Sequence, residues 1–348
     1  MLGIGKLIFM MGNLFTIQRW NNKPAVVKFS EADNAYSTLL ISFALREYYN
    51  MEIEKAVKWR MSRILPKLVL SDVSLELKER VERLSPDVWE KVRDKAFKDL
   101  YNIVEKDQLD NLTDEKFEPI DKFADIYTSF FEAKVNDKVF DFKKPILELE
   151  EKLNKYNNNF PDDIPKIFFS IALNMVSMVR WNRIYRNIKT TVAGHSFIVV
   201  AISFIIAKLL NLEKDSVENI IKRALLHDLP EAFTGDVITP TKKKTKELDM
   251  LVSMVEKEMF NEWLKENPKI SYLKKYENMV SDPFSTFEGQ IVRIADYFAA
   301  LLECSLEIFS GNKEITFRNV FFDLKKHLKT FEKLDLGEWI DEIEDIVF

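Results

Sequence analysis

Residues 191–234 read TVAGHSFIVVAISFIIAKLLNLEKDSVENIIKRALLHDLPEAFT, and this stretch decides the fold. An apolar run from Phe197 to Leu210 follows His195, and a second run from Ile220 to Leu226 ends at His227. Apolar runs of this length and composition are typical of buried helices. The stretch therefore predicts two buried helices, each with a histidine at one end.

The composition extends the helical prediction to the whole chain. Only 8 of 348 residues are glycine, and long stretches carry Leu, Ile, Lys, Glu and Phe at helical spacing. Hydrophobic residues make up 47% and charged residues 31%, which is a normal balance for a globular protein, and the length favours two domains. A net charge of -5 argues against nucleic acid as a partner. We therefore expect an all-α protein that does not bind nucleic acid.

The chain repeats itself weakly, with matches in the same order in both halves. Arg19-Trp20-Asn21 recurs as Arg180-Trp181-Asn182, 161 positions later. Further matches, at offsets of 161, 164 and 171, are Ile41-Ser42-Phe43 with Ile202-Ser203-Phe204, Leu65-Pro66 with Leu229-Pro230, Asp72-Val73 with Asp236-Val237, and Ala124-Asp125 with Ala295-Asp296. Because several matches occur in order with few gaps, they predict a tandem duplication.

The duplication predicts where the domains lie. The first repeat covers residues 1–155 and the second covers 165–348, with the joint in the polar stretch around 157–163. Residues 7–18 then align with an internal segment, so we expect the apolar start of the chain to be a helix of the domain and not a signal peptide. No run of about 18 uninterrupted apolar residues predicts a membrane span.

Four residues in the second half form a set that can bind a metal ion. His195 and His227 lie at the ends of apolar runs, Asp228 follows directly, and Asp296 lies in a third apolar segment. Each has a plain alternative, since a lone histidine is often a core residue and a lone aspartate often caps a turn. A charge among apolar neighbours is costly unless it is paired or bound to a metal. Together, two imidazoles and two carboxylates favour a divalent ion with open positions.

The ordered pattern resembles the HD-domain metal phosphohydrolases, and within them the bacterial 5′-deoxynucleotidase branch. The residues that carry the resemblance are Arg180-Trp181, Gly194-His195-Ser196, His227-Asp228-Leu229-Pro230-Glu231, Thr234-Gly235-Asp236, Thr239-Pro240 and Ala295-Asp296. The resemblance implies two HD-type helical bundles in tandem, arranged as an intramolecular pseudo-dimer. Whether the chain also forms homo-oligomers is left open.

The resemblance also implies a role for each matched residue. The ligands of one metal ion would be His195, His227, Asp228 and Asp296. Glu231 would orient or deprotonate the attacking water, and Asp236 would contact the sugar or help to position water. Arg180 would grip the phosphate, Trp181 would pack against the sugar, and Thr239 would contact the substrate.

Several of these residues have a structural alternative. Trp181 can be a core residue, Asp236 a turn residue, Glu231 a first-turn charge after a proline, and Lys242-Lys243-Lys244 a solvated loop that does not steer substrate. One departure from the family is Gly194, where a glutamate often precedes the first metal histidine. This change affects the surroundings of His195 and removes no ligand.

The first repeat is expected to have lost the metal site. Asn34 takes the place of His195, Arg63 of His227, Ile64 of Asp228 and Lys67 of Glu231, whereas Asp125 matches Asp296. Arg63 would lie opposite Asp125 and replace the charge of the ion. The first repeat would then act as a scaffold, or bind a regulatory nucleotide through Arg19.

The sequence predicts a cytoplasmic, metal-dependent phosphatase of nucleoside 5′-monophosphates, and deoxynucleotides would be preferred. One metal is expected, because the remaining histidine, His327, lies in a late amphipathic segment. Mn, Co, Fe, Ni, Zn and Mg all fit His/Asp ligands. The alternatives are an HD hydrolase of dNTP or ppGpp-like nucleotides and a non-catalytic nucleotide-binding module. A lone cysteine, Cys304, fits a reducing compartment.

Overall fold

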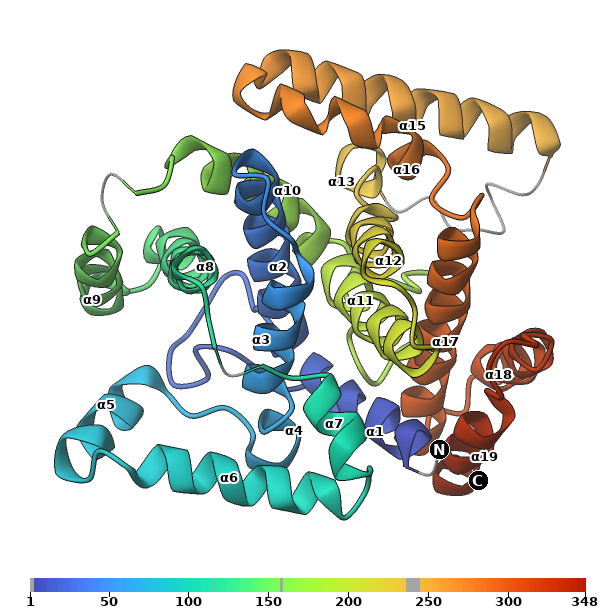
Figure 1. Cartoon of the computed structure of the whole chain (residues 1–348), viewed down its shortest axis with the longest axis horizontal. Coiled ribbons are helices and arrows are strands. Elements are labelled where there is room, and N and C mark those ends of the chain that lie inside the picture. The colour runs from blue at the N-terminus through green and yellow to red at the C-terminus, as the bar shows by residue number, and fades with distance from the viewer. Residues whose placement is uncertain (1–2, 115, 157–158, 236–244) are drawn as a thin grey trace.

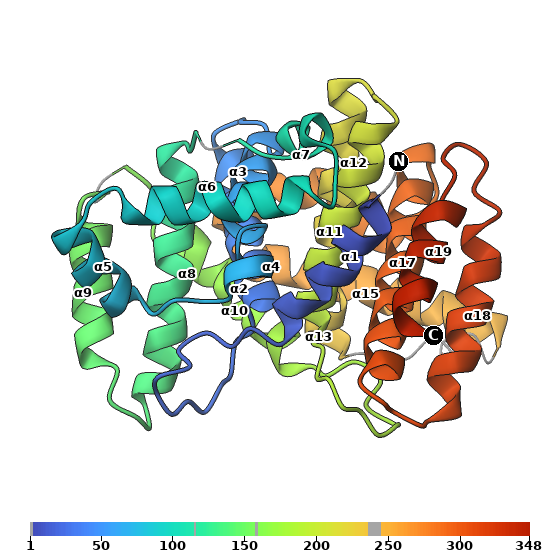
Figure 2. The same ribbon diagram turned by 90° about the horizontal axis from the view of Figure 1, so that it is seen from below.

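The computed structural model describes residues 3–114, 116–156, 159–235 and 245–348. Helices form throughout these ranges, which contain no extended strand and only two isolated bridges, Gln18 with Ser30 and Val179 with Thr191. The all-α fold class predicted from the sequence is therefore confirmed. Figure 1 shows the helices in chain order, and Figure 2 shows them from below.

The helices of the first half are α1 (Ile4–Met11), η1 (Gly12–Phe15), α2 (Glu31–Tyr48), α3 (Glu54–Ile64), α4 (Lys67–Leu70), α5 (Leu75–Leu84), α6 (Val88–Tyr101), α7 (Lys106–Asn111), α8 (Pro119–Asp137) and α9 (Lys143–Asn154). Those described in the second half are α10 (Asp163–Ser177), α11 (Val192–Leu209), α12 (Lys214–Leu226), α13 (Glu231–Thr234), α15 (Lys246–Glu266), η2 (Pro268–Tyr276), α16 (Glu277–Ser281), α17 (Phe287–Phe309), α18 (Ile315–Leu328) and α19 (Gly337–Val347). In the described part of both halves, short helices such as α4 and α13 lie between the long ones.

Helix α11 is the central helix of the second half. The side chain of Thr191 caps its N-terminus by accepting a hydrogen bond from the Gly194 N–H, and residues 192–207 are all buried. A helix that is apolar on every face must be surrounded, and α11 packs against α2, α10, α12 and α17. By length and composition α11 could cross a membrane, but 89% of that window is buried inside the protein.

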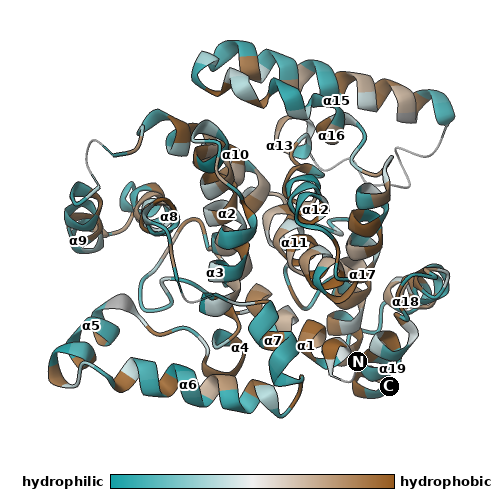
Figure 3. Cartoon of the chain, in the orientation of Figure 1, coloured by the Kyte–Doolittle hydropathy of each residue, from teal (hydrophilic) through white to brown (hydrophobic). Residues whose placement is uncertain are grey.

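The two halves share one hydrophobic core. Helix α1 of the first half packs against α17 and α19 of the second, and its residues Ile4, Leu7 and Ile8 are fully buried. Reciprocally, α10 of the second half packs against α2 and α8 of the first, while α2 and α11 pack against each other at the centre (Figures 1 and 2). Figure 3 shows the apolar residues gathered on these inner helices, with hydrophilic residues on outer helices such as α6 and α15.

Unusual backbone geometry recurs at matching positions of the two halves. Trp20 and Trp181 have φ of 56° and 58°, and Asn50 and Asn211 have φ of 53° and 48°. The bridges Gln18–Ser30 and Val179–Thr191 also differ by 161 positions. Positive φ is costly for a bulky residue such as tryptophan, so both sites must be held by specific contacts.

Candidate metal centre

Helix ends and one helix middle bring the predicted metal ligands together. His195 is the fourth residue of α11, His227 follows the last residue of α12, and Asp228 lies in the turn before α13. The ligand atoms of His195, His227 and Asp228 all lie within 4.8 Å of one another. Asp296, from α17, is outside this tight set but places Oδ1 3.0 Å from His195 Nε2. The four residues therefore converge from three separate helices.

Hydrogen bonds orient both imidazole rings. His227 Nδ1 lies 2.8 Å from the carbonyl oxygen of Ala224, so Nδ1 carries the proton and Nε2 is the free nitrogen. That Nε2 is buried and makes no hydrogen bond within the described part of the chain, although Asp228 Oδ2 lies 3.0 Å away. For His195, Nδ1 lies 3.3 Å from Glu303 Oε1, and Nε2 faces Asp296. Each ring thus presents Nε2 to the carboxylates.

The donor set fits a divalent cation. Two imidazole nitrogens and two carboxylates are ligands that borderline divalent ions accept. Among the described residues, Nε2 of His227 accepts no hydrogen bond, so its lone pair is available to an ion. Burial and the Arg180 guanidinium lower the pKa of His195, but Glu303 and Asp296 outweigh them and raise it to about 9. Asp228 is half-buried, and although burial raises its pKa, His227, His195 and Arg180 hold that pKa well below the usual range. The site is therefore an acidic cluster that favours positive charge.

Glu303, which was not predicted from the sequence, contacts several residues of the site from its buried side. Its side chain is fully buried on α17, and its carboxylate lies 3.2 Å from Arg180 Nε and accepts a 2.5 Å hydrogen bond from Trp181 Nε1. Together with its contact to His195, Glu303 connects a metal ligand to both residues expected to bind substrate. Two signals were available: Glu303 follows Asp296 by seven residues on the same helix face, and Glu132 matches it at offset 171.

Arg180 and Trp181 are held beside the cluster in different ways. In the described residues, Arg180 makes its side-chain hydrogen bonds through Nε alone, so its two Nη groups face away from Glu303 and can bind an anion. Trp181 packs against Phe317, with 5.6 Å between ring centroids, and is half-buried at the edge of the core. The bond to Glu303 and this ring contact compensate for its positive φ.

Glu231 opens the short helix α13, one turn beyond His227. It is half-buried, and its charge helps to raise the pKa of Arg180, which places the two side chains in one electrostatic environment. Asp236, Thr239 and the run Lys242-Lys243-Lys244 lie outside the described residues, so their expected roles stay predictions.

Close helix packing explains why Gly194 stands before His195. A Cβ at this position would lie 3.2 Å from Phe15 Cε1 and 3.3 Å from Ala32 Cβ, both in the first half. A glutamate here would therefore require the neighbouring side chains to shift. A neighbouring acid comes instead from α2, where Asp33 accepts a hydrogen bond from the Thr191 hydroxyl that caps α11.

At the matching offsets the first half has a similar set of supporting contacts, with other residues at the positions of His195, His227 and Asp228. Glu132 accepts hydrogen bonds from Arg19 Nε at 2.8 Å, Trp20 Nε1 at 2.9 Å and Asn34 Nδ2 at 2.8 Å, as Glu303 contacts Arg180, Trp181 and His195. Arg63 was expected opposite Asp125, and its charge does lower the pKa of Asp125, but the ion pair is formed by another arginine. Arg60, one turn earlier and on the buried face of α3, pairs with Asp125 at 2.9 Å.

Comparison with known proteins places the second half in a family. Residues 167–345 match the family described as 5′-deoxynucleotidase YfbR-like. A 4′-phosphooxetanocin A phosphatase from Priestia megaterium is 30% identical over 145 residues, which is 39% of this chain and 70% of that protein. A 5′-deoxynucleotidase from Pectobacterium atrosepticum is 26% identical over 173 residues, covering 48% of this chain and 86% of the relative.

Among solved structures, an HD-domain phosphohydrolase from Listeria innocua is 25% identical, with a TM-score of 0.39. That alignment covers 52% of this chain and 98% of the other. The family match spans more than half of the sequence and contains every residue of the metal cluster. The chain therefore belongs to the family of YfbR-like 5′-deoxynucleotidases.

Proposed function

We propose that the chain hydrolyses nucleoside 5′-monophosphates, preferably deoxynucleotides, in a reaction that depends on one divalent metal ion. Family membership makes it a phosphoric monoester hydrolase, and both named relatives are phosphatases of nucleotide-like molecules. The observation that carries the proposal is the convergence of His195, His227 and Asp228 within 4.8 Å, beside Arg180, whose Nη groups make no hydrogen bond among the described residues.

The residues of the chain would divide the chemistry as follows. His195, His227, Asp228 and Asp296 would hold the ion, which supplies a water of lowered pKa and polarises a phosphoryl oxygen when bound. The Nη groups of Arg180 would bind two phosphate oxygens in a planar fork. Glu231 would accept the proton of the attacking water as its oxygen bonds to phosphorus and the ester P–O bond breaks. The proton then passes to the leaving 5′ oxygen, which gives a nucleoside and inorganic phosphate.

The sugar preference rests on Trp181. Its indole is fixed by Glu303 and Phe317, and a rigid ring beside the phosphate-binding arginine can discriminate the sugar by contact. Asp236 and Thr239 would complete this part of the site. The buried Cys304 thiol and the absence of a disulfide fit the cytoplasmic location that we propose.

The experiment is phosphate release from dNMPs, NMPs and dNTPs by metal-stripped protein to which Mn, Co, Mg or Zn is added back. We expect release from monophosphates only with metal, at a higher rate for deoxynucleotides. The Glu231→Gln variant should bind the same metal and lose about 10²–10⁴-fold in kcat. Release from dNTPs alone, or metal-independent release, would defeat the proposal.

We also infer that the two halves arose by duplication, with domains at residues 1–155 and 165–348 that form an intramolecular pseudo-dimer. Support comes from matched contacts: Asn136 accepts hydrogen bonds from the N–H groups of residues 26 and 27, and Glu307 accepts them from residues 187 and 188. These partners correspond at the same offsets as the metal-site residues. The first half would serve as a permanent partner for the second.

A further inference from the structure

A large cavity opens in the first half, at the place that corresponds to the metal centre of the second. Its volume is about 970 Å³, and it lies among α2, α3, α4, α5, α6, α8 and α9. Ten Lys or Arg residues and seven Asp or Glu residues line it. A cavity of this size accommodates a ligand as large as a nucleotide. The cavity is therefore both basic and large enough for an anionic organic molecule.

At the positions that match the metal centre, the cavity carries positively charged side chains. Arg63 stands where the second half has His227, and Lys67 where it has Glu231. Arg60 corresponds to Ala224 at the same offset. A position that favours a cation in one half thus carries fixed cations in the other. Fixed cations in a partly desolvated cavity attract an anion more strongly than they would in water.

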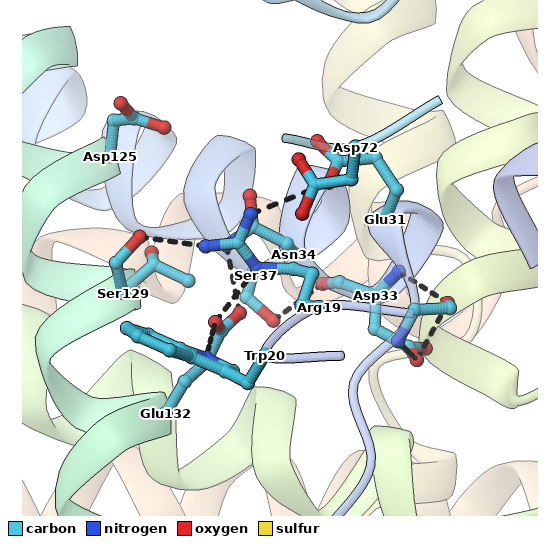
Figure 4. Close-up of polar contacts among 12 residues, drawn as sticks. Arg19, Trp20, Glu31, Asp33, Asn34, Ser37, Asp72, Asp125, Ser129 and Glu132 are labelled. Carbon is cyan, nitrogen blue, oxygen red and sulfur yellow. Dashed lines mark hydrogen bonds and ion pairs between the residues drawn. The ribbon is translucent and has the colours of Figure 1, made fainter. Parts of the chain in front are cut away.

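The contacts that position Arg19 and Trp20 have been kept. Figure 4 shows Arg19 between Glu132, Ser129 and Glu31, with the Trp20 indole beside it. Trp20 and Trp89 both reach the wall of the cavity. The cavity therefore has aromatic surface as well as charge, although all three nitrogen groups of Arg19 already have partners.

The positive charges around the cavity are only partly balanced by the acids that line it. Within the described residues, Arg63 forms no hydrogen bond or ion pair, and the buried Nε of Arg60 has no hydrogen-bond partner. Lys78 meets only Glu82, at 3.9 Å. Burial lowers the pKa of Lys78, and the nearby charges of Arg63, Lys122 and Lys67 lower it further. Among the described residues, Arg63 is thus the cation of the cavity that has no close carboxylate partner, whereas Arg60, Lys67 and Lys122 are paired.

We propose that this cavity binds the phosphate monoester group of a nucleotide-sized ligand through Arg63 and the lysines around it, without a metal ion and without hydrolysis. A guanidinium matches the phosphate oxygens, and the unpaired charge of Arg63 makes it the central contact. Trp20 and Trp89 offer surfaces for the organic part of the ligand.

The residues that would carry out hydrolysis in the second half have no counterparts among the residues that line the cavity. Lys67 replaces the proposed base Glu231 and is paired with Glu31 at 2.7 Å and with Asp72 at 3.1 Å. Asp125 is tied to Arg60 and Lys122, and no histidine lies among the lining residues. A bound phosphate ester would therefore meet a cation at the position of the proposed base, and no histidine that could help to hold a metal ion.

The test is equilibrium binding of dAMP to the full-length chain in EDTA, measured by calorimetry. An Arg180→Gln variant removes the phosphate contact of the second half, and Arg63→Gln removes the one proposed here. Lys265→Glu, on the exposed surface of α15, controls for a general change of charge. Arg63 has no ion pair to lose among the described residues, so Arg63→Gln should fold, and circular dichroism checks this.

We expect dAMP to bind the Arg180→Gln variant, and Arg63→Gln to weaken binding at this site about tenfold or more. Binding should weaken as NaCl rises, deoxyadenosine should not bind, and inorganic phosphate should bind more weakly than dAMP. No dAMP binding to Arg180→Gln, or equal affinity for Arg63→Gln and wild type at this site, would overturn the proposal. Equal binding of deoxyadenosine would overturn the role of the phosphate.

Discussion

Replacing Glu303 by glutamine should weaken metal binding from outside the ligand set. Glu303 contacts His195, Arg180 and Trp181 with its two oxygens, and all three partners present an N–H group. In Glu303→Gln one oxygen becomes an amide NH₂, so a donor faces a donor and Arg180 loses its buried counter-charge. We expect a loss of about 3 kcal/mol in the free energy of unfolding. Metal affinity should fall about 10–100-fold, because His195 is no longer oriented and polarised.

The matched control is Glu132→Gln in the first half. Glu132 accepts bonds from Arg19, Trp20 and Asn34 in the same arrangement, but none of these is a metal ligand. This variant should lose similar stability and keep the wild-type metal affinity. Chelator competition would give the metal dissociation constants, and urea denaturation the stabilities. An unchanged metal affinity in Glu303→Gln, or an equal loss in both variants, would refute the assigned role.

Three further outcomes are expected. His227→Ala should abolish stoichiometric metal binding and phosphate release, whereas the exposed His327→Ala should keep both; metal analysis and phosphate assays decide. Arg180→Lys should lower kcat/KM about 10–100-fold in steady-state kinetics, since an ammonium cannot form the planar fork. An unchanged kcat/KM at normal metal content would show that the fork is not used. Asp125→Asn should lose about 3 kcal/mol at pH 7. Arg60 and Lys122 outweigh burial and depress the pKa of Asp125, so this contribution to stability is present above about pH 4 and decreases as the pH falls. If urea denaturation gave the same stability difference between variant and wild type at pH 7 and at pH 3, the pairing would be contradicted.

The apolar run that follows His195 and the one that ends at His227 were sufficient to predict α11 and α12. They were also sufficient to predict that the two histidines lie at helix ends, because a buried helix leaves few places for a polar ring. The convergence of His195, His227 and Asp228 followed from the ordered motif. Asp236 and Thr239 fall outside the described residues and remain predictions.

The sequence did not show which helix faces pack against each other. Periodicity shows that a helix face is buried but does not name its partner, so the packing of α1 against α17 and α19, and of α10 against α2 and α8, was not foreseen. Glu303 resembled one more charge in a helix until its contacts with Arg180 and Trp181 were visible. Likewise, offsets pointed to Arg63 as the partner of Asp125, although the geometry of α3 directs Arg60 to it.

At the contact between α2 and α11, the two halves of the chain carry different residues at matching positions. Asp33 and Gly194 occupy matching positions, 161 residues apart, yet one supplies an acid to the Thr191 cap and the other must be small to let α11 approach Ala32 and Phe15. Two identical subunits related by a two-fold axis present the same residue on both sides of their interface. Carrying both halves on one polypeptide removes that restriction, so each side of the seam is free to change separately.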